Sequence, residues 1–194
     1  MKTLLLDSNA VALITTSHFT DTIDAIKGEL PSIAHDRYLL IDASDIEGYR
    51  GYHTLKAAAG EGEPEGIELS LHDPFNIMYS SGTTGLPKGI VHTHAIRIAY
   101  GTSFAAAYRM TPENITMHAG AIVFNGAFVD MMPTFFVGAT YILLPQFDPE
   151  SYIETVAREK VTHVMMVPAQ IIALLNAQRF SPDPPKRSHM RLLL

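Results

Sequence analysis

Residues 79–89 read Y-S-S-G-T-T-G-L-P-K-G, and the rest of the chain is organised around this stretch. It holds four Ser and Thr side chains, three glycines and one lysine, with no acidic side chain among them. The segments before it (75–79) and after it (89–92) each have the apolar character of a strand. Glycines let backbone N–H groups approach a ligand, hydroxyls donate hydrogen bonds, and Lys88 supplies a positive charge. The stretch therefore predicts a loop between two strands that holds a polyanion.

The familiar glycine-rich motifs do not match this stretch. The P-loop of nucleotide triphosphatases needs G-x-x-x-x-G-K-[ST] at the start of a helix. In this chain Gly82 and Gly85 are three residues apart, and Lys88 follows a proline. A Rossmann fingerprint, G-x-G-x-x-G, is absent from the sequence. A plain hairpin loop is the simplest alternative, but it has no need of so many hydroxyl groups and a lysine.

Composition narrows the class of protein. The chain has 194 residues, of which 47% are hydrophobic and 18% charged, which is typical of a folded domain with a sizeable core. The net charge of −6 argues against nucleic acid and anionic membranes as partners. The absence of cysteine excludes disulfides, thiolate zinc sites and a cysteine nucleophile. No apolar run reaches the ~18 residues of a membrane span, and the apolar segment at the N-terminus is too short for a signal peptide, so we expect a cytoplasmic protein.

Before the loop, the pattern predicts a small parallel unit. Residues 11–15 and 38–41 are expected strands, and the segment 21–29 between them has the apolar spacing of a helix. Residues 60–66, G-E-G-E-P-E-G, offer no side chain to a core.

This pattern suggests three parts. We expect a first β-α-β portion at 1–59, an acidic glycine-rich linker at 60–72, and an α/β portion with the loop at 73–194. The chain stops in an apolar run, L-L-L, so we expect the last portion to be truncated at its C-terminal end.

After the loop, strands and helices alternate. The expected strands are 115–123, 140–144 and 163–167, and the expected helices are 94–108, 124–136, 149–160 and 170–177. Asp148 precedes Pro149 and is a candidate N-cap. The order predicts an α/β fold with mostly parallel sheet layers covered by helices.

At this point a family resemblance can be stated. The segment 79–89 resembles the signature loop of the adenylate-forming (AMP-binding) enzymes, which include acyl-CoA synthetases, luciferases and the adenylation domains of peptide synthetases. The segments 138–140 (G-A-T) and 147–150 (F-D-P-E) and the pair Val167-Pro168 resemble further parts of that family. The resemblance implies a fragment of the large N-terminal domain of an acyl-CoA synthetase-like enzyme.

The resemblance also implies a reaction and its cofactors. A carboxylate attacks the α-phosphorus of ATP and pyrophosphate leaves, after which a thiol, commonly that of CoA, attacks the acyl-adenylate. Mg²⁺ is expected as well, and the family's motif for it would lie beyond Leu194. By resemblance, the residues that bind the phosphates are Ser80, Ser81, Gly82, Thr83, Thr84, Gly85 and Lys88. Of these we expect Thr83, Thr84 and Lys88 to be catalytic, and Tyr79 and Pro87 to be scaffold.

A second segment, Phe124-Asn125-Gly126, is the expected substrate pocket. The resemblance places it along the acyl tunnel, where the family usually has a histidine at the position of Phe124. Phenylalanine at this position therefore puts the role of that histidine in question for this chain. The alternative is that the three residues are only the start of a helix in the core.

The isolated histidines and acids are expected to be structural. His92 and His94 would share a face if both lay on one strand, but no third ligand has metal-site spacing, and we expect no metal site. His118 and His163 lie in apolar strands and are expected core residues with satisfied hydrogen bonds. Asp130, a lone acid in an apolar helix, is expected to be hydrogen-bonded, with a role at the pocket as the alternative.

The resemblance implies a ligase of fatty acid metabolism: an ATP-dependent, AMP-forming acid–thiol ligase. We expect a fatty or other apolar carboxylate first, an aryl acid next and an amino acid last. The expected partner is the missing C-terminal part of the same enzyme, without which the fragment would be inactive. A non-catalytic nucleotide- or anion-binding remnant is the alternative from a different class, and an unrelated phosphotransferase is a third. The sequence leaves the oligomeric state open.

Overall fold

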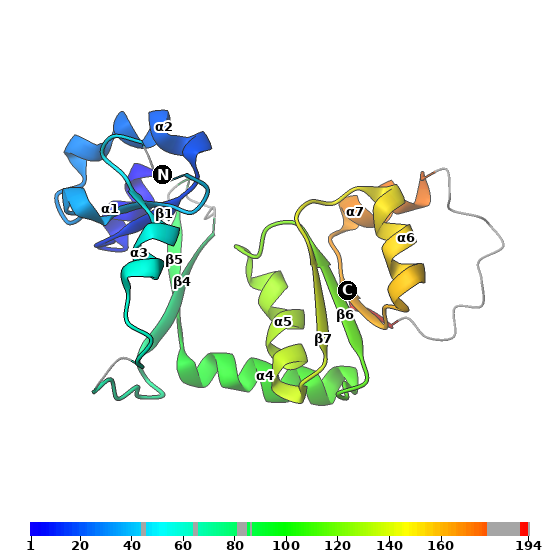
Figure 1. Ribbon diagram of the computed structural model, residues 1–194. Helices are drawn as coiled ribbons and strands as arrows, with labels where there is room; N and C mark the ends of the chain where they lie inside the picture. Colours follow the sequence, from blue (N-terminus) through cyan, green and yellow to red (C-terminus); the bar gives the residue numbers. More distant parts are fainter. Residues whose placement is uncertain (44–45, 64–65, 81–84, 86, 178–190, 194) are drawn as a thin grey trace. The chain divides into compact units, whose positions relative to one another are not determined.

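The structure is a computed structural model that describes residues 1–43, 46–63, 66–80, 85, 87–177 and 191–193 (Figure 1). The chain divides into two compact units. The first contains Met1–Leu69 and Tyr79–Ile90, and the second contains Ser70–Met78 and Val91–Leu194. The segment 79–90, which includes the predicted phosphate loop, is thus grouped with the N-terminal residues. The division proposed from the sequence had placed it with the portion that follows the linker.

The first unit is a small parallel sheet with short helices. Its strands are β1 (Leu13–Thr15), β2 (Tyr38–Leu40) and β3 (Arg50–Gly51), in the order β1-β2-β3, and its helices are α1 (Lys2–Asp7), α2 (Thr20–Asp24) and α3 (Tyr52–Ala58). Both strand pairs are parallel. The segment expected to be one helix over 21–29 divides into α2 and a 3-10 turn, η2 (Lys27–Glu29). The buried core consists of Ile23, Leu30, Ile33, Tyr38, Leu40 and Tyr49.

The two strands beside the predicted loop are β4 (Pro74–Ser80) and β5 (Lys88–Thr93), which pair with each other as a two-stranded sheet. Both strands were predicted from their apolar residues, and both are present. Thr93 then caps the next helix, α4 (His94–Tyr108), because its Oγ1 accepts a hydrogen bond from Ile96 N.

The second unit contains a four-stranded parallel sheet in the order β7-β6-β8-β9. Its strands are β6 (Ile115–Ala119), β7 (Thr140–Leu144), β8 (His163–Met165) and β9 (Arg191–Leu193). Its helices besides α4 are α5 (Asn125–Val137), α6 (Pro149–Glu159) and α7 (Pro168–Leu175). The buried core of this unit consists of Met117, Ala119, Tyr152, Val161, Val164 and Met166.

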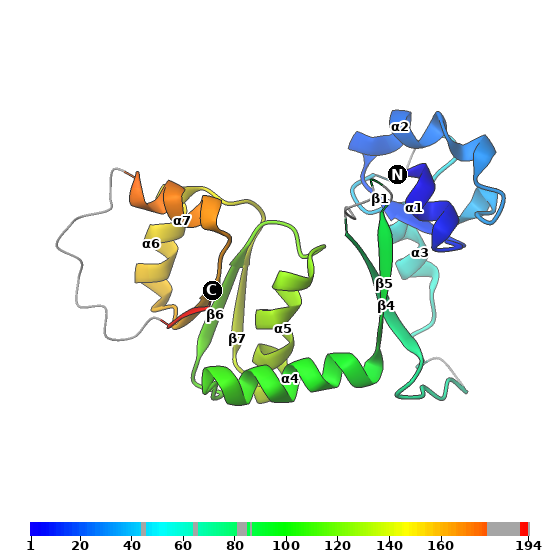
Figure 2. The same cartoon turned by 180° about the vertical axis from the view of Figure 1, so that it is seen from behind.

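The chain reverses its direction of travel across this sheet at β7, an edge strand. From β6 it moves through α5 to β7 on one side, and from β7 it returns through α6 to β8 on the other side of β6. Parallel crossovers are right-handed, so a reversal of direction puts the two connecting helices on opposite faces. Figure 1 and Figure 2 show α5 on one face and α6 with α7 on the other. The predicted mostly parallel, helix-covered α/β fold is confirmed.

One predicted element was too long. The strand expected over 115–123 ends at Ala119, because Gly120 has a φ of 102° and its backbone leaves the extended conformation. Residues 121–124 are outside the sheet, and α5 begins at Asn125. The N-cap predicted at Asp148 is confirmed, since Asp148 Oδ1 accepts a hydrogen bond of 2.9 Å from Ser151 N.

The described part of the chain contains no helix that is both long enough and apolar enough to cross a membrane.

Candidate active site

Of the predicted phosphate loop, the structure describes both ends and Gly85. Ser80 closes β4 and Lys88 opens β5, and both are exposed. Among the ion pairs between described residues none includes Lys88, so the ammonium group is not committed to a carboxylate within the described part of the chain. The predicted contacts Ser81, Gly82, Thr83 and Thr84 lie outside the described residues, and their roles remain predictions.

The backbone of this segment requires a glycine at position 85. Gly85 has a φ of 83°, a conformation in which a side chain would be strained. Tyr79, expected to be scaffold, donates a hydrogen bond of 2.6 Å from its hydroxyl to Asp7 Oδ2 in the same unit. This hydrogen bond raises the pKa of Tyr79, so the side chain is a neutral anchor for the end of β4.

The predicted pocket segment lies at the topological switch point of the four-stranded sheet. In open parallel sheets, ligands bind beyond the carboxyl ends of strands where the connections diverge to opposite faces. Here the connections diverge between the neighbouring strands β6 and β8, because β6 leads to β7 and β8 leads to β9 on the opposite side. The segments that follow β6 and β8 are 120–124 and 166–167. The start of α5 lies against the end of β8, where Gly126 faces the flexible end of the Met165 side chain.

The segment that leads into α5 is apolar and open. Ile122, Val123 and Phe124 are 39%, 64% and 69% exposed. Phe124 is therefore no core residue in the described structure, contrary to the alternative in which the segment is merely the buried start of a helix. Asn125, by contrast, is half-buried, and both the oxygen and the nitrogen of its side-chain amide are hydrogen-bonded. Its Oδ1 accepts from Arg97 at 3.0 Å, and its Nδ2 donates to the Tyr100 hydroxyl at 2.9 Å.

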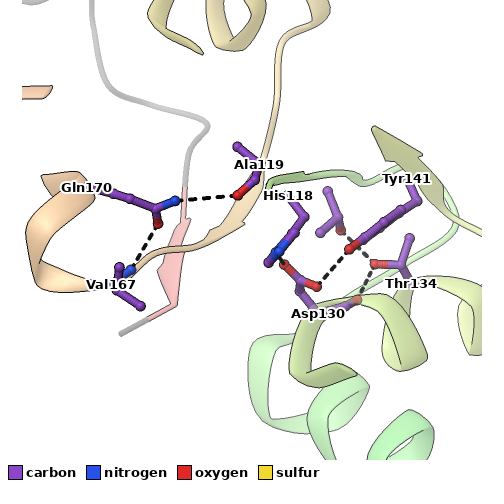
Figure 3. Close-up of polar contacts among 8 residues, drawn as sticks. His118, Ala119, Asp130, Thr134, Tyr141, Val167 and Gln170 are labelled. Atoms are coloured by element: carbon purple, nitrogen blue, oxygen red, sulfur yellow. Dashed lines mark hydrogen bonds and ion pairs between the residues drawn. The ribbon is translucent and has the colours of Figure 1, made fainter. Parts of the chain in front are cut away.

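A buried polar network joins α5 to the neighbouring strands (Figure 3). Asp130, which is fully buried, accepts a hydrogen bond of 3.2 Å from the Tyr141 hydroxyl, and its Oδ2 lies 3.4 Å from His118 Nδ1. Thr134 Oγ1 lies 2.6 Å from the Asp130 carbonyl oxygen and 2.8 Å from Thr116 Oγ1. The expected hydrogen bonding of Asp130 is confirmed, and the network fixes α5 on β6 and β7.

Burial decides the electrostatics of this network. It raises the pKa of Asp130, while the contact with His118 and the Tyr141 hydroxyl act in the opposite direction. Burial beside Asp130 also raises the pKa of Tyr141, so this phenol stays neutral and donates.

Gln170 connects the start of α7 to the end of β6. Its Oε1 accepts from Val167 N at 3.1 Å, and its Nε2 donates to the Ala119 carbonyl oxygen at 3.4 Å (Figure 3). The side chain therefore links the first turn of α7 to the last residue of β6. This contact was not predicted, because the sequence separation of 51 residues leaves no local pattern.

His92 and His94, which the sequence places two residues apart, lie on different elements. His92 lies on β5 and His94 is the first residue of α4, so they do not share a strand. Among the described residues, no group of three or more His, Asp or Glu side chains could hold a metal ion. His163, expected in the core, is buried, with its ring nitrogens 2.9 Å from Thr162 Oγ1 and 3.3 Å from the Tyr108 carbonyl oxygen.

The fold is that of the N-terminal domain of adenylate-forming enzymes. The family model described as "AMP-binding enzyme" matches residues 1–194, and the chain belongs to this family.

Individual relatives agree with the family. The chain is 30% identical over 176 residues to a feruloyl-CoA synthase of an Amycolatopsis species, covering 88% of this chain and 31% of the relative. It is 28% identical to a long-chain-fatty-acid–CoA ligase of Thermus thermophilus, covering 89% and 30%. A crystal structure of the anthranilate CoA ligase AuaEII in complex with anthranoyl-AMP matches with a TM-score of 0.77 and 25% identity, over 92% of this chain and 35% of that one. The chain thus spans about a third of the length of these relatives.

Proposed function

We propose that the protein containing this chain is an ATP-dependent, AMP-forming acid–thiol ligase that activates an apolar carboxylate. The observation that carries the proposal is the segment 79–89, which supplies hydroxyls, glycines and an exposed Lys88 between two paired strands of a chain in the AMP-binding enzyme family. Such a segment suits a polyphosphate, because backbone N–H groups and hydroxyls donate hydrogen bonds and the ammonium group neutralises charge.

The proposed reaction has two steps. In the first, a carboxylate oxygen of the substrate attacks the α-phosphorus of ATP, and the bond to the bridging oxygen breaks as pyrophosphate leaves. In the second, a thiolate, with CoA as the proposed acceptor, attacks the acyl carbon, and AMP leaves with the electron pair of the broken bond. Both leaving groups are anions, so donors placed at the departing phosphates lower the barrier. We assign this role to Thr83, Thr84 and Lys88, supported by Ser80, Ser81, Gly82 and Gly85.

The substrate class is proposed from the segment beyond β6. Phe124, Val123 and Ile122 present apolar surface at the carboxyl edge of the sheet, where an acyl chain or ring would be desolvated. The three relatives described above are named for a feruloyl group, a long-chain fatty acid and anthranilate. We propose a fatty carboxylate as the first choice and an aryl carboxylate as the second, with Phe124, Asn125 and Gly126 at the pocket.

The proposal is tested on the full-length protein by ATP–pyrophosphate exchange with octanoate, benzoate and phenylalanine, followed by thioester formation with CoA. We expect exchange that depends on octanoate or benzoate and exceeds that with phenylalanine. ATP binding without exchange for any of the three carboxylates would instead favour the alternative of a non-catalytic nucleotide-binding protein.

A further inference from the structure

Arg97 is the largest side chain of the described residues that is almost completely buried, at 1% exposure. It lies on the first turn of α4, and its guanidinium group lies over two aromatic rings. The guanidinium carbon is 4.1 Å from the ring centre of Phe128 and 5.0 Å from that of Tyr100. Burial lowers the pKa of Arg97, because desolvation disfavours the charged form.

Neutral acceptors surround this guanidinium. Nε and one terminal nitrogen of Arg97 donate hydrogen bonds to Asn76 Oδ1 at 3.1 and 3.0 Å. The other terminal nitrogen donates a hydrogen bond to Asn125 Oδ1 at 3.0 Å. None of the ion pairs between described residues involves Arg97. A buried cation without a carboxylate partner is costly, so its planar fork must be well satisfied by the two asparagines.

The two arms of the fork reach different elements. Asn76 lies on β4, which leads into the segment 79–89, and Asn125 is the first residue of α5. The helix start has no side-chain cap, because the N-cap residue is Phe124, which has no acceptor atom in its side chain. Arg97 therefore ties the uncapped start of α5 to β4 by hydrogen bonds, beside an edge contact between the rings of Phe75 on β4 and Phe128 on α5.

We infer that Arg97 is a positioning residue of the acyl site: its guanidinium fork holds Asn125 and the apolar segment before it in place by anchoring them to Asn76. This inference rests on the proposed function for its kinetic consequence. β4 is also held by its pairing with β5, whereas the start of α5 follows the exposed residues 121–124. Loss of the fork should therefore disturb the carboxylate side of the reaction more than the ATP side.

Two substitutions in the full-length protein separate the fork from the charge. Arg97→Lys keeps the charge but removes the planar fork, and it should raise the KM for octanoate or benzoate about tenfold while the KM for ATP stays within about twofold. Asn76→Asp keeps an acceptor oxygen for the guanidinium and places a carboxylate beside it that offsets the positive charge of Arg97. This variant should leave both KM values within about twofold. Arg158→Lys, at an exposed arginine on α6, is the matched control and should change neither.

Amide hydrogen exchange tests whether Arg97 holds the start of α5 in place, and it needs no enzymatic assay. In full-length Arg97→Lys, the amides of residues 125–129 should exchange about tenfold faster than in wild type, while those of β7 should be unchanged. Unchanged exchange at 125–129 would overturn the inference, as would an Asn76→Asp variant with the same rise in KM as Arg97→Lys. A wild-type protein without carboxylate-dependent activity would refute the proposed function, and the exchange data would still decide the role of Arg97.

Discussion

Asp130 shows how burial governs a single charged residue in this chain. It has no exposed surface, and its partners are one phenol and one imidazole. The folded-state pKa is raised above the ordinary value of 3.8, so the unfolded chain releases this proton at a lower pH than the folded chain does. The contribution of Asp130 to stability is therefore present below the unfolded pKa and is lost as the pH rises through the folded pKa.

Asp130→Asn should remove this pH dependence. The amide keeps an acceptor for the Tyr141 hydroxyl and cannot ionise, so the stability of the variant relative to wild type should increase as the pH rises above about 4. Thermal or denaturant unfolding across the pH range measures the difference. Asp36→Asn, at an exposed carboxylate, reports the general effect of such a change. A relative stability that falls with rising pH would contradict the assigned direction of the shift.

Residues differ in how well their role could be predicted. The hydrogen bonding of Asp130 was predictable, because a lone acid in an apolar helix needs a partner. The role of Arg97 was not, because its partners are 21 and 28 residues away in the sequence. Its only local signal was a charged residue within an otherwise apolar helix.

At the scale of elements, α4 and α5 pack closely around a glycine. A Cβ added to Gly101 on α4 would be 3.0 Å from Phe136 Cβ on α5, which is tighter than ordinary van der Waals contact. Small residues let helices approach, and this approach also brings Arg97 to the start of α5.

Gly101→Leu should destabilise the protein by about 1–3 kcal/mol, because the added side chain forces the two helices apart despite the higher helix propensity of leucine. Ser103→Leu, at an exposed position of the same helix, should change stability by no more than about 0.5 kcal/mol. Chemical denaturation of both variants measures the difference. Equal stability of the two variants would show that α4 and α5 do not depend on the glycine.

Element types were more predictable than element ends. Apolar periodicity and the Asp148 cap predicted the α/β order that follows the loop, and the structure confirms it. The strand that ends at Ala119 was predicted too long because residues 121–123 are as apolar as a strand. The positive φ of Gly120 ends it, and a glycine in the sequence does not reveal its φ.

At the scale of the whole molecule, the predicted functions are divided between the two units. The residues of the segment 79–90 belong to the first unit and the predicted pocket residues to the second. The class of protein was predictable because the segment 79–89 is specific in sequence. The identity of the carboxylate was not, since an apolar surface accepts a fatty chain and an aromatic ring alike.

The central claim is that Lys88 and its loop handle the pyrophosphate of an adenylation reaction. The most direct measurement is carboxylate-dependent ATP–pyrophosphate exchange by the full-length protein and its Lys88→Ala variant, with Lys56→Ala as a control at an exposed lysine of the first unit. We predict a loss of at least about a hundredfold for Lys88→Ala and wild-type exchange for the control. Undiminished exchange in Lys88→Ala would contradict the account.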